Sequence, residues 1–192
     1  MRRVYSFLPV FLHAQKVAKI IGLVIAALLL SSCASMSEQE CLTANWQDQG
    51  FRDGRNGEPL ARIEDHRQAC AKVGVTPDQR LYFKGRDQGI LHYCTPDNAI
   101  REGRLGRAYR NACPAHLEHR FLQAYEQGKE IYDVEQHIEK LNTESNQLEQ
   151  ALRKEEDRDK HRYLRQELRD IDRQLQRARD DLRYLERRLR YY

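Results

Sequence analysis

The side chains that could do chemistry form no recognisable catalytic set in this sequence. There is no Gly-x-Ser-x-Gly nucleophile motif, no His-Glu-x-x-His metal motif and no Gly-Lys-Ser/Thr phosphate loop. The histidines beyond residue 38 that could act as ligands include His66, His92, His116, His119 and His137. They share no ligand spacing apart from one pair three residues apart, which is weak evidence for a metal. We therefore expect no catalytic residue, no metal site and no cofactor, and a protein that is not an enzyme.

The cysteines offer a clearer chemistry. Four of the five, Cys41, Cys70, Cys94 and Cys113, lie in one stretch of the chain, and an even number in an exported protein indicates two disulfides. Three pairings are possible, and the sequence alone does not choose among them. An antiparallel pair of short helices over residues 38–57 and 60–73 would place Cys41 beside Cys70. We therefore favour Cys41–Cys70 and Cys94–Cys113.

A zinc site that uses these cysteines with His66 or His92 is the alternative to disulfides. The sequence holds no Cys-x-x-Cys pair, and the spacings match no zinc module. An exported protein also meets an oxidising compartment, where thiols pair. These three points favour disulfides over zinc.

The fifth cysteine, Cys33, follows a segment typical of a secretory signal. The first nineteen residues hold four basic side chains and no acidic one, and the apolar run over 20–30 is shorter than the about 20 residues that span a bilayer. The junction Leu30-Ser31-Ser32-Cys33 resembles the bacterial lipobox, whose cysteine is diacylated on sulfur and then exposed by signal peptidase II. We predict cleavage after residue 32 and a lipid anchor on Cys33, because two or three acyl chains hold a protein stably on a membrane.

The predicted cleavage also changes the charge and suggests a location. The whole chain has 33 basic and 29 acidic residues, and the signal removes four basic residues and no acidic one. The mature chain is formally neutral, which gives no support for nucleic-acid binding. In the enteric-type sorting rule an Asp after the lipidated cysteine retains a lipoprotein in the inner membrane. Ala34 therefore predicts the periplasmic face of the outer membrane over the inner membrane.

The mature chain divides by composition into a tether, a head and a tail, over residues 33–37, 38–114 and 115–192. The head contains the four paired cysteines, and the tail contains no proline and one glycine. Helix signals recur through the head, including Thr76-Pro77-Asp78 before a helix that runs to about Tyr93. Thr95-Pro96-Asp97 opens a less regular stretch, and Cys113-Pro114 starts the tail helix. We expect an all-α fold.

Glycines recur in the head in a pattern that predicts close helix packing. The copies are 51–57, 83–89, 100–106 and 125–128, and in each an aromatic or aliphatic residue precedes glycine. Their irregular spacing excludes a solenoid period. Glycines three or four residues apart give a helix a flat strip that a second helix can approach. The alternative, a glycine-rich phosphate loop, lacks its lysine and a preceding strand.

The tail has the alternating three-four apolar spacing of a coiled-coil seam. The seam is interrupted over residues 153–162 and resumes in a register displaced by two residues. A fold-back about Arg158 restores the register and pairs Leu141 with Leu175. It also brings together opposite charges, because 115–157 has a net charge of −6 and 158–192 of +5. We favour this antiparallel hairpin over one continuous helix, which the absence of glycine and proline from 153–163 would allow.

Cysteines, glycines and aromatic residues of the region 38–140 form one further pattern. They are Cys41, Trp46, Gly50, Asp53, Gly54, Gly57, Cys70, Tyr82, Gly85, Gly89, Tyr93, Cys94, Gly103, Gly106, Tyr109, Cys113, Pro114, Phe121, Tyr125 and Gly128. This pattern resembles the bacterial lipoprotein family filed as domain of unknown function 2799. The resemblance implies a lipoprotein with a small cysteine-containing head. It implies no activity, because the family has no assigned chemistry.

Two functions remain open on the sequence. The first is a structural or protein-interaction lipoprotein, whose head or coiled tail docks an envelope partner or a second copy of the chain. The second is a ligand-binding or enzymatic head that acts on an envelope metabolite or glycan through the positions around Trp46, Tyr82 and Tyr93. The seam in the tail and the missing catalytic set favour the first.

Overall fold

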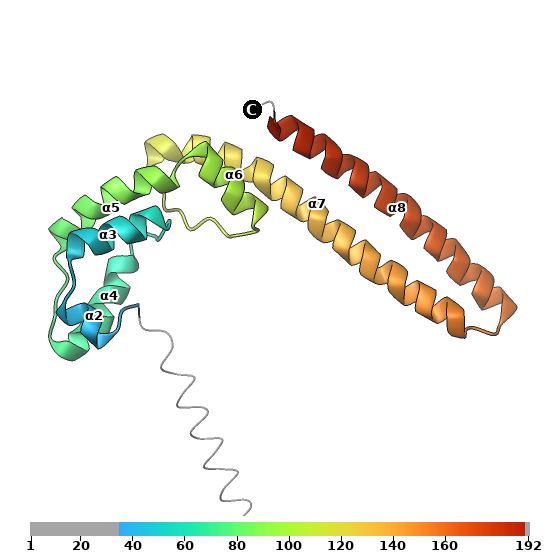
Figure 1. Cartoon of the computed structure of the whole chain (residues 1–192), viewed down its shortest axis with the longest axis horizontal. Helices are drawn as coiled ribbons and strands as arrows, with labels where there is room; N and C mark the ends of the chain where they lie inside the picture. The colour runs from blue at the N-terminus through green and yellow to red at the C-terminus, as the bar shows by residue number, and fades with distance from the viewer. Residues whose placement is uncertain (1–34, 191–192) are drawn as a thin grey trace, which may run out of the picture. The chain divides into compact units, whose positions relative to one another are not determined.

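The computed structural model describes residues 35–190, and every regular element in this range is a helix (Figure 1). The predicted signal peptide and Cys33 lie outside the described residues. No helix between residues 35 and 190 is long and apolar enough to cross a membrane. The elements are α2 (Glu38–Leu42), α3 (Trp46–Arg55), α4 (Arg62–Cys70), the 3-10 helix η1 (Ala71–Val73), α5 (Gln79–Tyr93), α6 (Pro96–Arg104), α7 (Ala115–Lys154) and α8 (Arg158–Arg190).

The helices belong to two compact units, and the chain passes from one unit to the other more than once. Unit 1 contains residues up to Asn45 together with Ala61–Asp78. Unit 2 contains Trp46–Leu60 and Gln79 onward. The predicted helix over 38–57 is therefore two helices, and its second part, α3, belongs to unit 2.

Unit 1 is held together by the disulfide between Cys41 on α2 and Cys70 at the end of α4, as predicted. Both cysteines are buried, and their Cα atoms are 5.4 Å apart. The bond closes a loop with a sequence separation of 29, which by loop entropy stabilises the fold by roughly 3 to 4 kcal/mol. Such a contribution matters in a unit whose three helices are all short.

Residues 35–37, just before α2, are packed in unit 1 instead of extending from it as a tether. Ser37 caps α2, because its Oγ accepts a hydrogen bond from the Glu40 backbone N–H while the Glu40 carboxylate accepts one from the Ser37 N–H at 2.7 Å. The Ser35 hydroxyl lies 2.9 Å from Nδ1 of the buried His66, and Met36 is buried. The histidine considered as an alternative zinc ligand is thus a core residue of this unit.

Unit 2 begins with two parallel helices, α3 and α5, whose backbones touch through glycines. A Cβ at Gly50 or Gly54 would overlap carbonyl groups of α5, and a Cβ at Gly85 or Gly89 would overlap carbonyl groups of α3. Each helix therefore presents two glycines four residues apart to its partner. The small-xxx-small pattern lets two helix backbones approach closely. The predicted packing role of these glycines is confirmed.

A second parallel pair, α6 and α7, repeats this arrangement. A Cβ at Gly103 would overlap the carbonyl of Tyr125, and one at Gly128 would overlap the carbonyl of Ile100. Each helix carries a buried alanine four residues earlier, Ala99 on α6 and Ala124 on α7. The small-xxx-small pattern is therefore kept, with alanine in place of the first glycine.

The two pairs also end alike. Gly57 after α3 and Gly106 after α6 have positive φ angles of 67° and 64°, and each donates its N–H to the carbonyl three residues earlier. A tyrosine ring, Tyr93 or Tyr132, covers each of these glycines closely enough to exclude a Cβ. The irregular sequence spacing arises because the connections differ in length: residues 56–78 link α3 to α5, and residues 105–114 link α6 to α7. The stretch after Thr95, expected to be less regular, is helix α6, capped by the Thr95 hydroxyl.

The tail is the predicted antiparallel hairpin: α8 folds back along α7 (Figure 1). Leu141 on α7 packs in one cluster with Ile171, Leu175 and Ala178 on α8, in the predicted register. The turn occupies residues 155–157, just before the predicted pivot at Arg158. No glycine or proline is needed, because the Asp157 carboxylate accepts hydrogen bonds from the backbone N–H groups of Asp159 and Lys160 and so begins α8.

Candidate binding site at the α5–α6 corner

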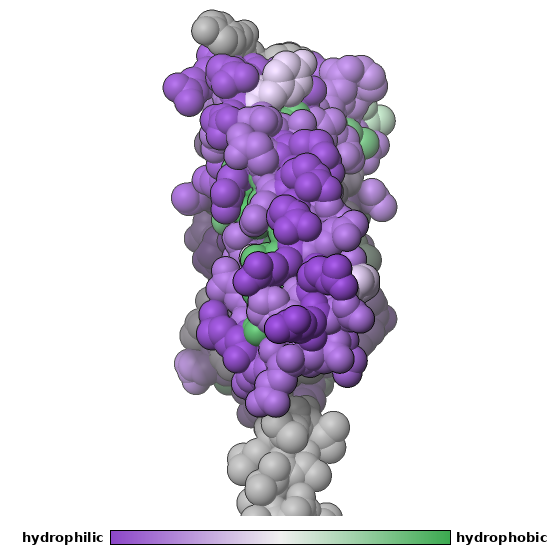
Figure 2. Space-filling view, turned by 90° about the vertical axis from the view of Figure 1, so that its right-hand side faces the viewer, coloured by the Kyte–Doolittle hydropathy of each residue, from purple (hydrophilic) through white to green (hydrophobic). Residues whose placement is uncertain are grey.

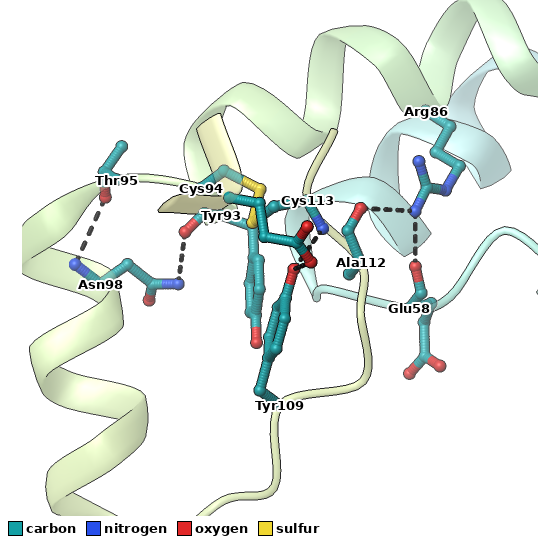
Figure 3. The surroundings of a disulfide bond; sticks show 10 residues. Glu58, Arg86, Tyr93, Cys94, Thr95, Asn98, Tyr109, Ala112 and Cys113 are labelled. Atoms are coloured by element: carbon teal, nitrogen blue, oxygen red, sulfur yellow. Dashed lines mark hydrogen bonds between the residues drawn. A yellow bond between two sulfur atoms is a disulfide. The ribbon is translucent and has the colours of Figure 1, made fainter. Parts of the chain in front are cut away.

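The corner between α5 and α6 is fixed by a disulfide and by side-chain hydrogen bonds (Figure 3). Cys94 directly follows α5, and its bond to Cys113 joins it to the residue two before α7; this second pairing is also as predicted. The Asn98 side chain donates a 2.8 Å hydrogen bond from Nδ2 to the Tyr93 carbonyl, across the turn. Because Asn98 is itself buried, these bonds set the direction of α6 relative to α5.

Behind the disulfide lies the aromatic core of unit 2. The ring of Tyr93 stacks on Phe121 with centroids 5.1 Å apart, and Tyr109 leans on the same Phe121 ring. The Tyr109 hydroxyl accepts a hydrogen bond from the Cys113 N–H at 3.0 Å and donates one to the Glu118 carboxylate at 2.9 Å. Burial, reinforced by the Glu118 carboxylate, raises the pKa of Tyr109 to about 12.

Arg86 on α5 joins two loops of unit 2 to this corner (Figure 3). Its Nη2 donates hydrogen bonds to the Glu58 carbonyl at 2.9 Å and to the Ala112 carbonyl at 3.1 Å. The guanidinium is buried, and this burial lowers its pKa. Arg86 therefore connects the turn after α3 with the residue next to Cys113, and its role is to hold these segments.

The corner borders a cavity of about 640 Å³. Phe51 and Arg55 on α3 and His92 on α5 line it, together with residues at the start of α6. The Phe51 and His92 rings meet edge to face with centroids 5.7 Å apart. Most small-molecule sites are concave spaces of about 300 to 1,000 Å³, so the cavity has a suitable size. The residues of the α6 end that line it are Thr95, Asp97, Asn98 and Arg101.

The three aromatic residues predicted to bind a ligand lie elsewhere in the fold. Trp46, Tyr82 and Tyr93 are 8%, 0% and 6% exposed. The Tyr82 hydroxyl donates a 2.7 Å hydrogen bond to the Asp53 carboxylate inside the α3–α5 pair. Ligand binding by these side chains stays a prediction, but their burial means that a ligand would reach them only if the core opened.

The sequence contains one signal for the cavity. An arginine follows the repeated glycine in the first three copies of the pattern, as Arg55, Arg86 and Arg104. The structure separates their roles: Arg86 is buried in the corner, whereas Arg55 is exposed at the cavity. His92, a candidate ligand of the alternative zinc site, lines the same cavity.

Over residues 35–190 the fold and the corner define a class of protein: an all-α arrangement with two disulfides, two glycine-packed parallel helix pairs and a helical hairpin. Residues 45–130 match the family described as "Protein of unknown function (DUF2799)". This match confirms the predicted resemblance to domain of unknown function 2799 over this stretch of the chain. The match ends within α7, after both glycine-packed pairs and before most of the hairpin. Comparisons with curated proteins and with solved structures found no match.

Proposed function

We propose that the protein is a cell-envelope lipoprotein, anchored through Cys33 at the periplasmic face of the outer membrane, that acts without catalysis by docking another envelope protein. The observation that carries this proposal is the thin hairpin. Of the residues of α8, only Ile171, Leu175 and Ala178 are buried. A two-helix hairpin of this length leaves most of its surface available to a partner.

The exposed aromatic residues of α8 are the best candidates for the docking surface. Tyr163 and Tyr184 are 62% and 59% exposed, and neither is in the apolar cluster that holds the hairpin together. Tyrosine is enriched where protein partners meet, because it adds large contact area at low entropic cost. Figure 2 shows one face of the molecule that is mostly hydrophilic, with small patches of hydrophobic residues between the polar ones and at its edge. We therefore expect a polar, salt-sensitive contact around a few aromatic side chains.

In-cell crosslinking of the full lipidated chain tests the docking role. The double variant Tyr163→Ser/Tyr184→Ser should lose a crosslinked partner that the unaltered protein retains. The matched control is Gln147→Ser/Gln150→Ser on α7, which also changes two exposed residues and should keep the partner. Circular dichroism should show equal helix content in all three. A product that contains only two copies of this chain, or equal recovery with both variants, would contradict docking of another protein through these tyrosines.

The anchor has its own test. Labelled palmitate should enter the unaltered protein and not the Cys33→Ser variant, which should remain as an uncleaved precursor. Fractionation of the labelled protein should place it with the outer membrane. Label in Cys33→Ser would contradict the anchor, and recovery with the inner membrane would contradict the proposed location.

A further inference from the structure

The two glycine-packed pairs place one arginine in equivalent positions. Arg55 follows Gly54 at the end of α3, and Arg104 follows Gly103 at the end of α6. In each pair the backbone N–H of this arginine lies against the glycine of the partner helix, Gly89 or Gly128. The two arginine side chains therefore start from equivalent positions in the two pairs, so the groups around them can be compared directly.

In the second pair the arginine is bound by carboxylates. The Arg104 guanidinium lies 3.5 Å from a carboxylate oxygen of Glu135 on α7 and 3.9 Å from one of Glu186 on α8. The folded tail thus supplies two anions at this position. Planar guanidinium groups match carboxylates well, because they offer several N–H donors in a fixed plane.

In the first pair the equivalent arginine, Arg55, lines the cavity instead. Among residues 35–190, the Arg55 guanidinium has no ion pair and no hydrogen bond. A second arginine, Arg101 on α6, lines the same cavity and donates a hydrogen bond to the Asn98 side-chain oxygen. Because Asn98 is buried and bonded to Tyr93, it holds Arg101 at the cavity wall.

We propose that this cavity binds a small molecule that carries a carboxylate group. Arg55 and Arg101 would bind the carboxylate, as Glu135 and Glu186 are bound by Arg104, and the rings of Phe51 and His92 would contact the rest of the molecule. Asp97 is the one acidic residue of the lining, and a Glu102 carboxylate oxygen lies 3.8 Å from Arg101 Nε; both charges oppose the ligand. The proposal does not depend on the docking role of α8, since all these residues lie on α3, α5 and α6.

Titration of the full mature chain, followed by ¹H–¹⁵N spectra that include the arginine Nε–H signals, tests the site. The probes are glucuronate with glucose as its neutral counterpart, and benzoate with benzyl alcohol. Each carboxylate should shift the Arg55 and Arg101 Nε–H signals and bind at least about tenfold more tightly than its neutral counterpart. Inorganic phosphate is titrated as a further probe. Carboxylates that bind no better than their neutral counterparts would overturn the proposal, as would signals that shift only with phosphate.

Three variants locate the effect. Arg55→Gln should weaken carboxylate binding by about tenfold or more, because it removes a charge-assisted contact and keeps a polar, unbranched side chain. Arg104→Gln, at the equivalent position of the second pair, should leave binding unchanged. Asp97→Asn should strengthen binding severalfold, because it removes the opposing charge. Unchanged binding in Arg55→Gln, with its helix content intact, would overturn the proposal.

Discussion

The glycine-packed pairs and the α7–α8 hairpin both pack one helix against another, but through different parts of the chain: backbone against backbone in the pairs, and side chain against side chain in the hairpin. In the pairs, the backbones touch at Gly54 and Gly89, and no side chain fits between them. In the hairpin, a layer that includes Leu141 and Leu175 separates the two backbones. Backbone contact tolerates almost no added atom, whereas a side-chain layer tolerates many sequences of similar volume. We call the two glycine-packed pairs the scaffold, because their packing is strict. We call the α7–α8 hairpin the arm, because its packing tolerates more change.

The family match follows this division. It covers residues 45–130, which include both glycine-packed pairs, and leaves most of the hairpin outside. The part of the chain that matches the family is thus the part whose packing is strictest. The contrast between strict and tolerant packing can be tested at four places, from the largest expected effect to the smallest.

A single added methyl group should damage the α3–α5 pair more than any other small change. Gly89→Ala places a Cβ where the Phe51 carbonyl oxygen already lies, so the helices must separate. We expect a loss of more than about 3 kcal/mol in the free energy of unfolding, measured by urea denaturation. Gly74→Ala is the control: its φ is +70° but no atom lies within 4 Å of the new Cβ, so the loss should be about 1 to 2 kcal/mol. Equal losses would refute strict packing.

The Cys94–Cys113 disulfide should be the next most important feature. It closes a loop with a sequence separation of 19, and its removal by Cys94→Ala/Cys113→Ala should cost about 3 kcal/mol through the entropy gained by the unfolded chain. Thermal melts followed by circular dichroism measure this. A melting temperature that does not fall would show that the aromatic core and Arg86 alone fix the corner.

In the hairpin, truncation should have a smaller and local effect. Leu175→Ala removes a side chain that is 6% exposed, and we expect a loss of about 2 kcal/mol, at the low end for buried leucine because the surrounding layer can relax. The loss should appear as faster amide exchange in α8, with α3 and α5 unaffected. Tyr163→Ala, at an exposed position of the same helix, should change stability by less than about 0.5 kcal/mol. A whole-chain loss of stability in Leu175→Ala would contradict a separable arm.

The smallest effect concerns alkaline pH. The pKa of Tyr109 is raised to about 12 from an ordinary value near 10, so folding favours the neutral phenol. Its contribution is fully present below pH 10 and is lost as the pH rises through about 12. Tyr109→Phe should therefore flatten the fall in unfolding free energy over this window and cost about 1 kcal/mol at pH 7, where the hydrogen bonds to Glu118 and from the Cys113 N–H are lost. An unchanged alkaline profile in the variant would assign the fall to other groups.

Much of this fold could be predicted from local chemistry. The signals at Thr76, Pro77 and Asp78 predict the helix that ends at Tyr93, the heptad pattern predicts the hairpin and its register, and both disulfide pairings follow the prediction. The same kind of signal at Thr95 and Pro96 starts helix α6, where a less regular stretch was expected. The break after α2 was missed, because Thr43–Asn45 carries no glycine or proline to mark it. The duplicated pairs were missed because their connecting segments differ in length, which hides the common offset between the copies.

The cavity was harder to predict, for a physical reason. Phe51, His92 and Arg101 stand on three helices, and only the glycine contact of α3 with α5 and the corner at Asn98 bring them together. Aromatic residues attract attention in a sequence as binding residues, yet Tyr82 and Tyr93 have enough partners in the core to be buried there. The cavity is lined instead mainly by polar side chains near helix ends, a kind that is abundant throughout this sequence.

Native-state hydrogen exchange of the full mature chain tests the division into scaffold and arm most directly. We predict that amides in the centres of α3, α5 and α6, and of α7 near Gly128, exchange only through the slowest opening. Amides of α7 and α8 around Leu141 and Leu175 should exchange through a separate opening of lower free energy. If both sets open together with one free energy and one dependence on denaturant, the hairpin is part of the scaffold, and the division into scaffold and arm is wrong.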